Sequence, residues 1–115
     1  MSNPSIAAVT FDCADAAALG TFWGAVLGRT LAADATADYA NLPGSPPLMF
    51  FSVPEGKAAK NRVHLDVAVD DLPGAVDRLI GLGAKRLGDF DESGFVWTTL
   101  ADPEGNEFDL VDGGH

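Results

Sequence analysis

Basic residues are scarce in this chain, where 7 lysines and arginines stand against 17 aspartates and glutamates and the net charge is −10. Nucleic acids and anionic membrane surfaces attract proteins through positively charged patches. The deficit therefore argues against both kinds of partner. A cationic small ligand suits this charge, although acidic groups that only confer solubility produce the same balance.

Cysteine and long apolar runs are also missing. The one cysteine, Cys13, can form neither a disulfide within the chain nor a cysteine-based metal cluster. No apolar run approaches the roughly 20 residues that span a bilayer, and residues 1–12 lack the basic and then apolar order of a secretory signal. We therefore expect a cytoplasmic protein that binds no membrane.

Residues 7–31 and 63–87 share one order of features, which indicates an internal repeat. Each stretch has a strand-like segment, an aspartate, a helix-like segment that ends in Leu-Gly, then a basic residue and a leucine. Asp15 and Asp71 are expected to cap the two helices, because their side chains can accept hydrogen bonds from exposed N–H groups of the first turn. The glycines that follow the helical leucines suit left-handed C-caps, at Gly28 and Gly83.

Three further strand-like segments follow each expected helix. They lie at residues 29–33, 38–42 and 48–53 in the first half and at 85–89, 95–100 and 107–111 in the second half. Each half therefore has a β-α-β-β-β order, and halves this small are expected to share a core. We predict one α+β domain over residues 1–115, in which the modules form a curved mixed sheet around a cleft. Module one is expected at about 5–54, a linker at about 55–60, and module two at about 61–112.

The segment KNRVHLDVAVDD, residues 60–71, contains the one histidine away from the end of the chain, His64. Its period of two predicts a strand with two different faces. The apolar face is expected to hold Val63, Leu65, Val67 and Val69, and the polar face Arg62, His64 and Asp66. Such a polar face can bind a metal, contact a ligand or simply lie against water.

Several motifs together point to a known family. The paired modules, FWGAVLG at the end of the first helix and DPEGNEFDLV near the end of the chain resemble the vicinal oxygen chelate superfamily. This superfamily includes glyoxalase I, extradiol dioxygenases, fosfomycin-resistance enzymes and bleomycin-resistance proteins. KNRVHLDVAVDDL with DPEGNEF is similar to its glyoxalase-like domain subgroup, and the likeness runs from about Ile6 to Val111. The resemblance implies a small-molecule cleft and a homodimer.

The resemblance also supplies a test for a metal. Metal-dependent members hold a divalent ion with His and Glu side chains on the first and last strands of both modules. His64 and Asp109 fall at these positions in the second module, whereas Ala8 and Phe51 in the first offer no donor. Catalytic zinc uses three protein ligands, so the sequence favours a protein without a complete metal site. If a divalent metal binds, His64 and Asp109 are its expected ligands, and Glu107 or a partner chain could add another.

The polar face has other expected roles when no metal is involved. Arg62 offers a planar donor fork for a carboxylate or carbonyl group, or an ion pair with Asp66. His64 is the candidate catalytic acid or base, although a structural histidine oriented by Asp66 or Asp109 fits as well. The predicted ligand contacts are Arg62, His64, Asp66, Phe51, Trp97, Glu107 and Asp109.

The favoured function is therefore a glyoxalase-like protein that binds a planar or cationic metabolite or drug. Aromatic walls combined with acidic groups suit such a ligand. A metal-dependent lyase, isomerase or dioxygenase that uses His64 and Asp109 is the alternative. A regulatory or structural domain with an unused cleft is a third hypothesis.

Overall fold

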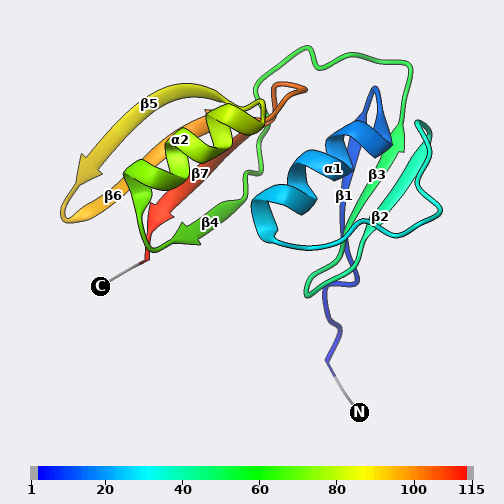
Figure 1. Cartoon of the computed structure of the whole chain (residues 1–115), viewed down its shortest axis with the longest axis horizontal. Helices are drawn as coiled ribbons and strands as arrows, with labels where there is room; N and C mark the ends of the chain where they lie inside the picture. The colour runs from blue at the N-terminus through cyan, green and yellow to red at the C-terminus, as the bar shows by residue number, and fades with distance from the viewer. Residues whose placement is uncertain (1–2, 114–115) are drawn as a thin grey trace. The chain divides into compact units, whose positions relative to one another are not determined.

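The computed structural model describes residues 3–113, which form two compact units: unit 1, up to Gly56, and unit 2, from Lys57. In each unit one helix lies against one face of a small mixed sheet (Figure 1). Within residues 3–113, no helix is both long and apolar enough to cross a membrane.

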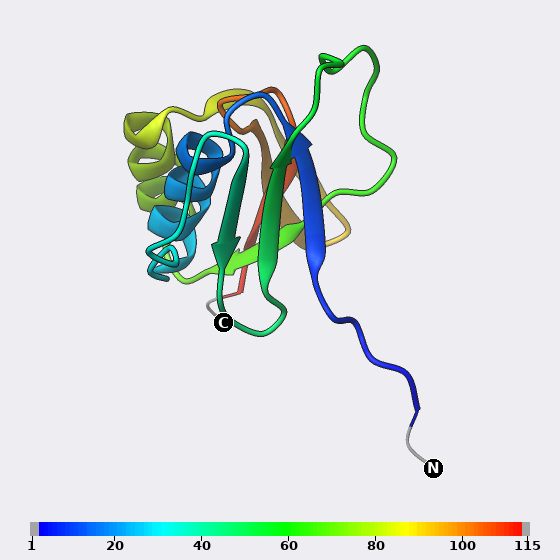
Figure 2. The same ribbon diagram turned by 90° about the vertical axis from the view of Figure 1, so that its right-hand side faces the viewer.

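Unit 1 has a three-stranded sheet and one helix. Its elements are β1 (Val9–Cys13), α1 (Ala16–Leu27), β2 (Tyr39–Leu42) and β3 (Leu48–Ser52). The central strand β3 runs parallel to β1 and antiparallel to β2, and Figure 2 shows it between these two partners. The sheet is therefore mixed, as predicted.

The core of unit 1 lies between α1 and the sheet. Trp23 of α1 is 1% exposed, so it packs in the core. The ring of Phe11 lies 5.6 Å from Trp23 and 5.1 Å from Phe50, which is fully buried. Its neighbour Phe51 is 40% exposed, because successive strand residues face opposite sides of the sheet.

The strand predicted at residues 29–33 does not form. The N–H of Ala32 donates to the carbonyl of Asn41 at 2.9 Å, but Ala32 then accepts a hydrogen bond from Ala35 in a turn. The guanidinium of Arg29 donates to the carbonyl of Pro46 at 2.8 Å. Single bonds of this kind hold the segment beside β2 without a ladder, so unit 1 has the order β-α-β-β.

Unit 2 has the full β-α-β-β-β order. Its elements are β4 (Asp66–Val69), α2 (Leu72–Leu82), β5 (Lys85–Glu92), β6 (Phe95–Ala101) and β7 (Glu107–Asp112). The strands lie in the order β4-β7-β6-β5, with β4 parallel to β7 and the other pairs antiparallel. Figure 1 shows α2 across one face of this sheet.

Both helices are capped as their sequences predict. Asp15 and Asp71 each accept a hydrogen bond from a backbone N–H in the first turn, at 3.1 and 3.2 Å. Gly28 and Gly83 follow the helices with φ angles of 67° and 118°, in the left-handed region that glycine adopts without steric cost. Local chemistry therefore sets where both helices begin and end.

The first strand of unit 2 is shorter than predicted. It begins at Asp66, and residues 62–63 form a bend. Val63 is 81% exposed and precedes the strand, so the prediction that it lies on the apolar face of this strand is wrong. The buried apolar side of the sheet is instead formed mainly by Leu100, Phe108 and Leu110, on which α2 packs through Val76 and Leu79.

Candidate functional site

The side of the unit 2 sheet opposite α2 carries the candidate site, and we call it the open face. Residues that alternate along β6 and β7 divide between the two sides, and Leu100, Phe108 and Leu110 are buried toward α2. The intervening residues therefore lie on the open face. They include Trp97, Thr99, Glu107, Asp109 and Val111, and the register pairs Trp97 with Val111 and Thr99 with Asp109.

His64 lies just before β4, beside two carboxylates. Its Nδ1 atom is 2.9 Å from Oδ1 of Asp66 and 3.7 Å from Oδ2 of Asp109. The parallel register of β4 and β7 pairs Asp66 with Asp109, which places both carboxylates on the open face. The structure thus brings together three of the residues that the sequence predicts as ligand contacts.

The hydrogen bonds of this cluster orient its side chains. The hydroxyl of Thr99 donates to Oδ1 of Asp109 at 2.6 Å. Asp109 is mostly buried, with 17% of its side chain exposed, whereas half of the His64 side chain is exposed. Because Nδ1 of His64 faces carboxylate oxygens, which only accept, we assign it the proton. The other ring nitrogen, Nε2, then has a free lone pair for a proton, a ligand or a metal.

The same three residues fit a divalent cation. Each offers one ligand atom, and these atoms lie within 4.8 Å of one another. One imidazole and two carboxylates are donors that zinc and non-haem iron accept, and three protein ligands are enough for a catalytic site. From the sequence, His64 and Asp109 are the expected metal ligands, with Glu107 or a partner chain as a possible third, whereas Asp66 is expected only to contact a ligand or to orient the histidine.

A hollow of about 850 Å³ lies over part of the open face. Its lining combines aromatic, aliphatic and acidic groups, which include Phe95, Trp97, Val111, Asp66, Asp109 and Asp112. The ring of Trp97 stacks on Phe90 of β5, with centroids 5.2 Å apart and an angle of 16° between the planes. A volume of this size suits a small molecule, and stacking restrains the indole before any ligand arrives.

Four predicted contacts are not part of the lining of this hollow. One is His64, which lies beside the lining residues Asp66 and Asp109. Arg62 is exposed in the bend before β4, and within residues 3–113 it forms no ion pair, so the predicted pairing with Asp66 does not occur. Phe51 belongs to unit 1, where its ring lies 5.2 Å from that of Tyr39. Glu107 is on the open face but is engaged by neighbours, and the ligand roles of all four stay predictions.

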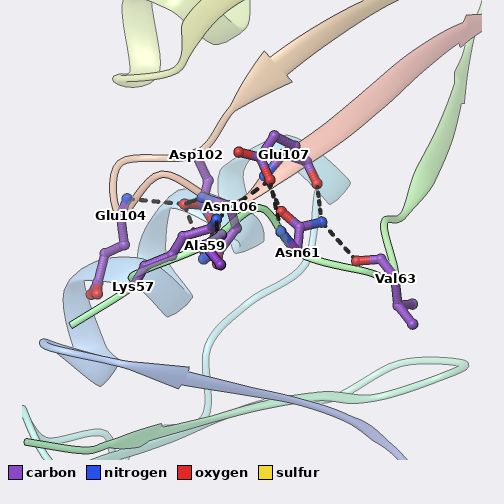
Figure 3. Close-up of polar contacts among 8 residues, drawn as sticks. All are labelled: Lys57, Ala59, Asn61, Val63, Asp102, Glu104, Asn106 and Glu107. Carbon is purple, nitrogen blue, oxygen red and sulfur yellow. Dashed lines mark hydrogen bonds and ion pairs between the residues drawn. The ribbon is translucent and has the colours of Figure 1, made fainter. Parts of the chain in front are cut away.

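Asn61, which has no predicted role from the sequence, anchors the segment that leads to His64. Its side-chain amide donates to the carbonyls of Glu107 and Val63 at 3.2 and 2.7 Å, and its Oδ1 accepts from the N–H of Glu107 at 3.0 Å (Figure 3). The backbone N–H of Asn61 also donates to Oε1 of Glu107 at 3.2 Å. These bonds hold residues 61–65 beside β7. The N–H of Asp109 in β7 also donates to the carbonyl of Leu65 at 2.9 Å.

The motif DPEGNEF forms the turn between β6 and β7. Asp102 is 3% exposed, and its carboxylate accepts hydrogen bonds from the backbone N–H groups of Glu104 and Asn106 at 2.9 and 3.0 Å. The side-chain amide of Asn106 donates to both carboxylate oxygens at 3.1 and 2.9 Å (Figure 3). Gly105 has a φ of 88°, which favours glycine. The motif therefore fixes the turn that leads into β7 and Asp109.

The environment of Glu107 lowers its pKa. Burial acts to raise the pKa of Glu107, but the backbone N–H groups of Asn61 and Glu107 and the charges of Lys57 and Lys60 outweigh burial. The ammonium of Lys57 lies 3.6 Å from Oε1 of Glu107. The pKa of Glu107 consequently lies below its ordinary value of 4.5.

Glu107→Gln should change how stability depends on pH. A lowered pKa means that ionised Glu107 stabilises the fold above its unfolded-state pKa, and that this contribution is lost as pH falls through the folded-state pKa. From about pH 6 down to about pH 3, the free energy of unfolding of the wild type should fall by up to roughly 1 kcal/mol more than that of Glu107→Gln. Urea unfolding at several pH values measures this. If Glu107→Gln and the exposed control Glu55→Gln follow the same curve, the assignment is wrong.

The two α+β units, each with a helix on a mixed sheet, define the fold of the glyoxalase/bleomycin-resistance proteins. The sequence matches the family model of the glyoxalase-like domain over residues 8–111, and the chain belongs to this family. No curated protein matches the sequence.

Solved structures with this fold share little sequence with the chain. A glyoxalase/bleomycin resistance protein/dioxygenase family enzyme from Burkholderia phytofirmans is 18% identical with a TM-score of 0.79, over 95% of this chain and 98% of that one. The fosfomycin resistance protein FosX from Mesorhizobium loti is 15% identical with a TM-score of 0.76, over 97% and 94% of the chains. A lactoylglutathione lyase from Agrobacterium tumefaciens is 16% identical with a TM-score of 0.69, over 97% and 96%. At these identities the likeness shows the fold.

Proposed function

We propose that this glyoxalase-like protein binds a planar or cationic small molecule on the open face of unit 2. The observation that carries this proposal is the hollow of about 850 Å³, which places Trp97 and Phe95 beside Asp66 and Asp109. An aromatic ring attracts a cation over its face, and carboxylates attract it further. The net charge of −10 adds a field that favours cations at long range.

The exposure of the groups supports a ligand of this kind. Phe95 is 73% exposed, so its ring has surface available to a flat ligand. Asp109 is held by Thr99 and Asp66 by His64, so both acceptors are pre-oriented. A ligand that meets pre-oriented groups loses less conformational entropy on binding.

A second candidate function is a metal-dependent enzyme, and the cluster of His64, Asp66 and Asp109 is the observation that favours it. A divalent ion held there would act as a Lewis acid on a substrate oxygen. Thr99 would keep Asp109 oriented in this role, and Asn61 would hold the segment that carries His64. The names of two structural neighbours, a lactoylglutathione lyase and a fosfomycin resistance protein, are compatible with an enzymatic role.

The proposal extends to domain organisation, compartment and oligomeric state. We take the two units as one glyoxalase-like domain, and the protein as a cytoplasmic homodimer. Cys13 is buried and its thiol lies 3.5 Å from the carbonyl oxygen of Phe51, which is compatible with a reducing compartment.

Calorimetric titration with benzamidinium and benzamide tests the binding function, because the probes share a planar shape and differ in charge. The protein is first dialysed against a chelator. We expect saturable binding of benzamidinium that is about tenfold tighter than that of benzamide. Equal affinities, or no binding of either probe, would contradict the proposal. Titration of the dialysed protein with zinc tests the second candidate, which needs stoichiometric binding that His64→Ala abolishes.

A further inference from the structure

The strand β5 forms one edge of the unit 2 sheet. Within residues 3–113 it pairs with β6 only, and nearly all of its residues are exposed. An edge strand offers unpaired backbone N–H and C=O groups, which are a template for pairing with another strand. The eight residues of β5 thus form an extended surface whose partner can be inferred from its chemistry.

The charges of β5 are arranged in opposite blocks. The strand has the sequence KRLGDFDE, so Lys85 and Arg86 are at its start and Asp91 and Glu92 at its end. The register with β6 shifts between Arg86 and Gly88, at Leu87. Because paired residues share a face, Arg86 and Asp91 lie on the α2 side, whereas Lys85 and Glu92 lie on the open face.

We propose that β5 pairs with β5 of a second copy of this chain, antiparallel and about a two-fold axis. Leu87 is left out of the ladder, so the paired residues of β5 are 85, 86 and 88–92. Asp89 is the middle residue of this set, and the two-fold axis therefore passes at Asp89. Arg86 then faces Asp91 of the partner subunit on the α2 side of the sheet. Lys85 faces Glu92 of the partner subunit on the other side. The two-fold axis repeats both pairs, so the same strand supplies both halves of a self-complementary surface.

At the axis Asp89 faces Asp89 of the partner subunit. The two carboxylates would repel each other if their charges were unpaired. Asp89 is already engaged by an ion pair with Arg86 and by the hydroxyl of Thr98 at 2.9 Å. The hydrogen bonds from Arg86 and Thr98 hold the pKa of Asp89 below its ordinary value. Asp89 therefore stays ionised, and the guanidinium of Arg86 in the same chain offsets its charge at the axis.

Exposed apolar side chains on the same hairpin would add contact area. Leu87, Phe90, Phe95 and Val96 are 49%, 41%, 73% and 38% exposed. They make up four of the nine large apolar residues that are exposed among residues 3–113, so apolar surface is concentrated there. Surface ion pairs contribute little energy each, so the charges set orientation and partner choice while backbone and apolar contacts supply affinity.

This interface rests on the homodimer proposed above, and its charged residues on β5 lie outside the lining of the ligand hollow. The test uses two full-length variants. In the acidic variant, Lys85→Glu with Arg86→Glu makes both blocks of β5 negative, and in the basic variant Asp91→Lys with Glu92→Lys makes both positive. We expect light scattering to show a wild-type dimer and, for each variant, a dimer dissociation constant at least about tenfold higher. Mixing the two variants should restore dimers that contain one chain of each.

The mixture also shows that the variants are folded, since unfolded chains would not restore a dimer. A charge-matched control, Asp70→Lys with Asp77→Lys, changes unit 2 outside β5 and should leave the dimer intact. A monomeric wild type would overturn both the homodimer and the interface. Variants that dimerise as the wild type does, or a mixture that stays monomeric, would overturn the interface alone.

Discussion

Asp102→Ala is expected to destabilise the protein by about 3 kcal/mol and to lower its Tm by about 10 °C. The buried carboxylate of Asp102 accepts four hydrogen bonds, from the N–H groups of Glu104 and Asn106 and twice from the Asn106 amide. Alanine would leave these donors without an acceptor in a region that excludes water, which costs more than the net energy of the bonds.

Thermal and urea unfolding measure this effect. The exposed control Asp34→Ala should stay within about 0.5 kcal/mol of the wild type. Asp102→Asn keeps one acceptor oxygen but turns an amide donor toward the Asn106 amide, so its loss should be intermediate. If Asp102→Ala is as mild as Asp34→Ala, the turn does not depend on this carboxylate.

The largest expected effect on binding is that of the double variant Asp66→Asn and Asp109→Asn. It should weaken the binding of benzamidinium about 30-fold, or roughly 1 kcal/mol for each charge removed, and leave the affinity for benzamide nearly unchanged. Asparagine keeps the shape and one acceptor oxygen of each side chain, so the bond from Thr99 to position 109 can persist. The change therefore isolates charge from packing.

A matched control separates local attraction from the overall field. Asp70→Asn with Asp77→Asn also removes two negative charges, from exposed positions just before α2 and within α2, which covers the other side of the unit 2 sheet. It should lower affinity far less, since exposed charges are screened within about 8 to 10 Å at moderate salt. Equal losses in both double variants would show that net charge, and not the cluster, attracts the ligand.

The elements predicted well from the sequence depend on local chemistry. Asp15 and Asp71 cap their helices through bonds within one turn, and Gly28 and Gly83 end them. The order of features in the two halves then identified the family over nearly the whole chain. The strand expected at residues 29–33 was wrong because a ladder needs continuous pairing, and Ala32 is held to β2 by one bond.

The candidate site was harder to predict because it depends on contacts between distant residues. The family likeness located His64 and Asp109, but the place of Asp66 beside Asp109 follows from the parallel register of β4 and β7. The sequence near Asn61 does not indicate its role, since its partner Glu107 lies 46 positions further along the chain. Val63 illustrates the same limit, because period-two alternation does not reveal that the strand begins only at Asp66.

The open face of unit 2 is the proposed ligand site, and an NMR titration of the protein with benzamidinium tests this most directly. We expect the largest shifts in the indole N–H of Trp97 and in the backbone amides of Asp66, Thr99 and Asp109, and we expect them to saturate with the calorimetric affinity. Saturating shifts whose largest changes lie on the α2 side of the sheet, at Leu100, Phe108 or Leu110, would contradict it.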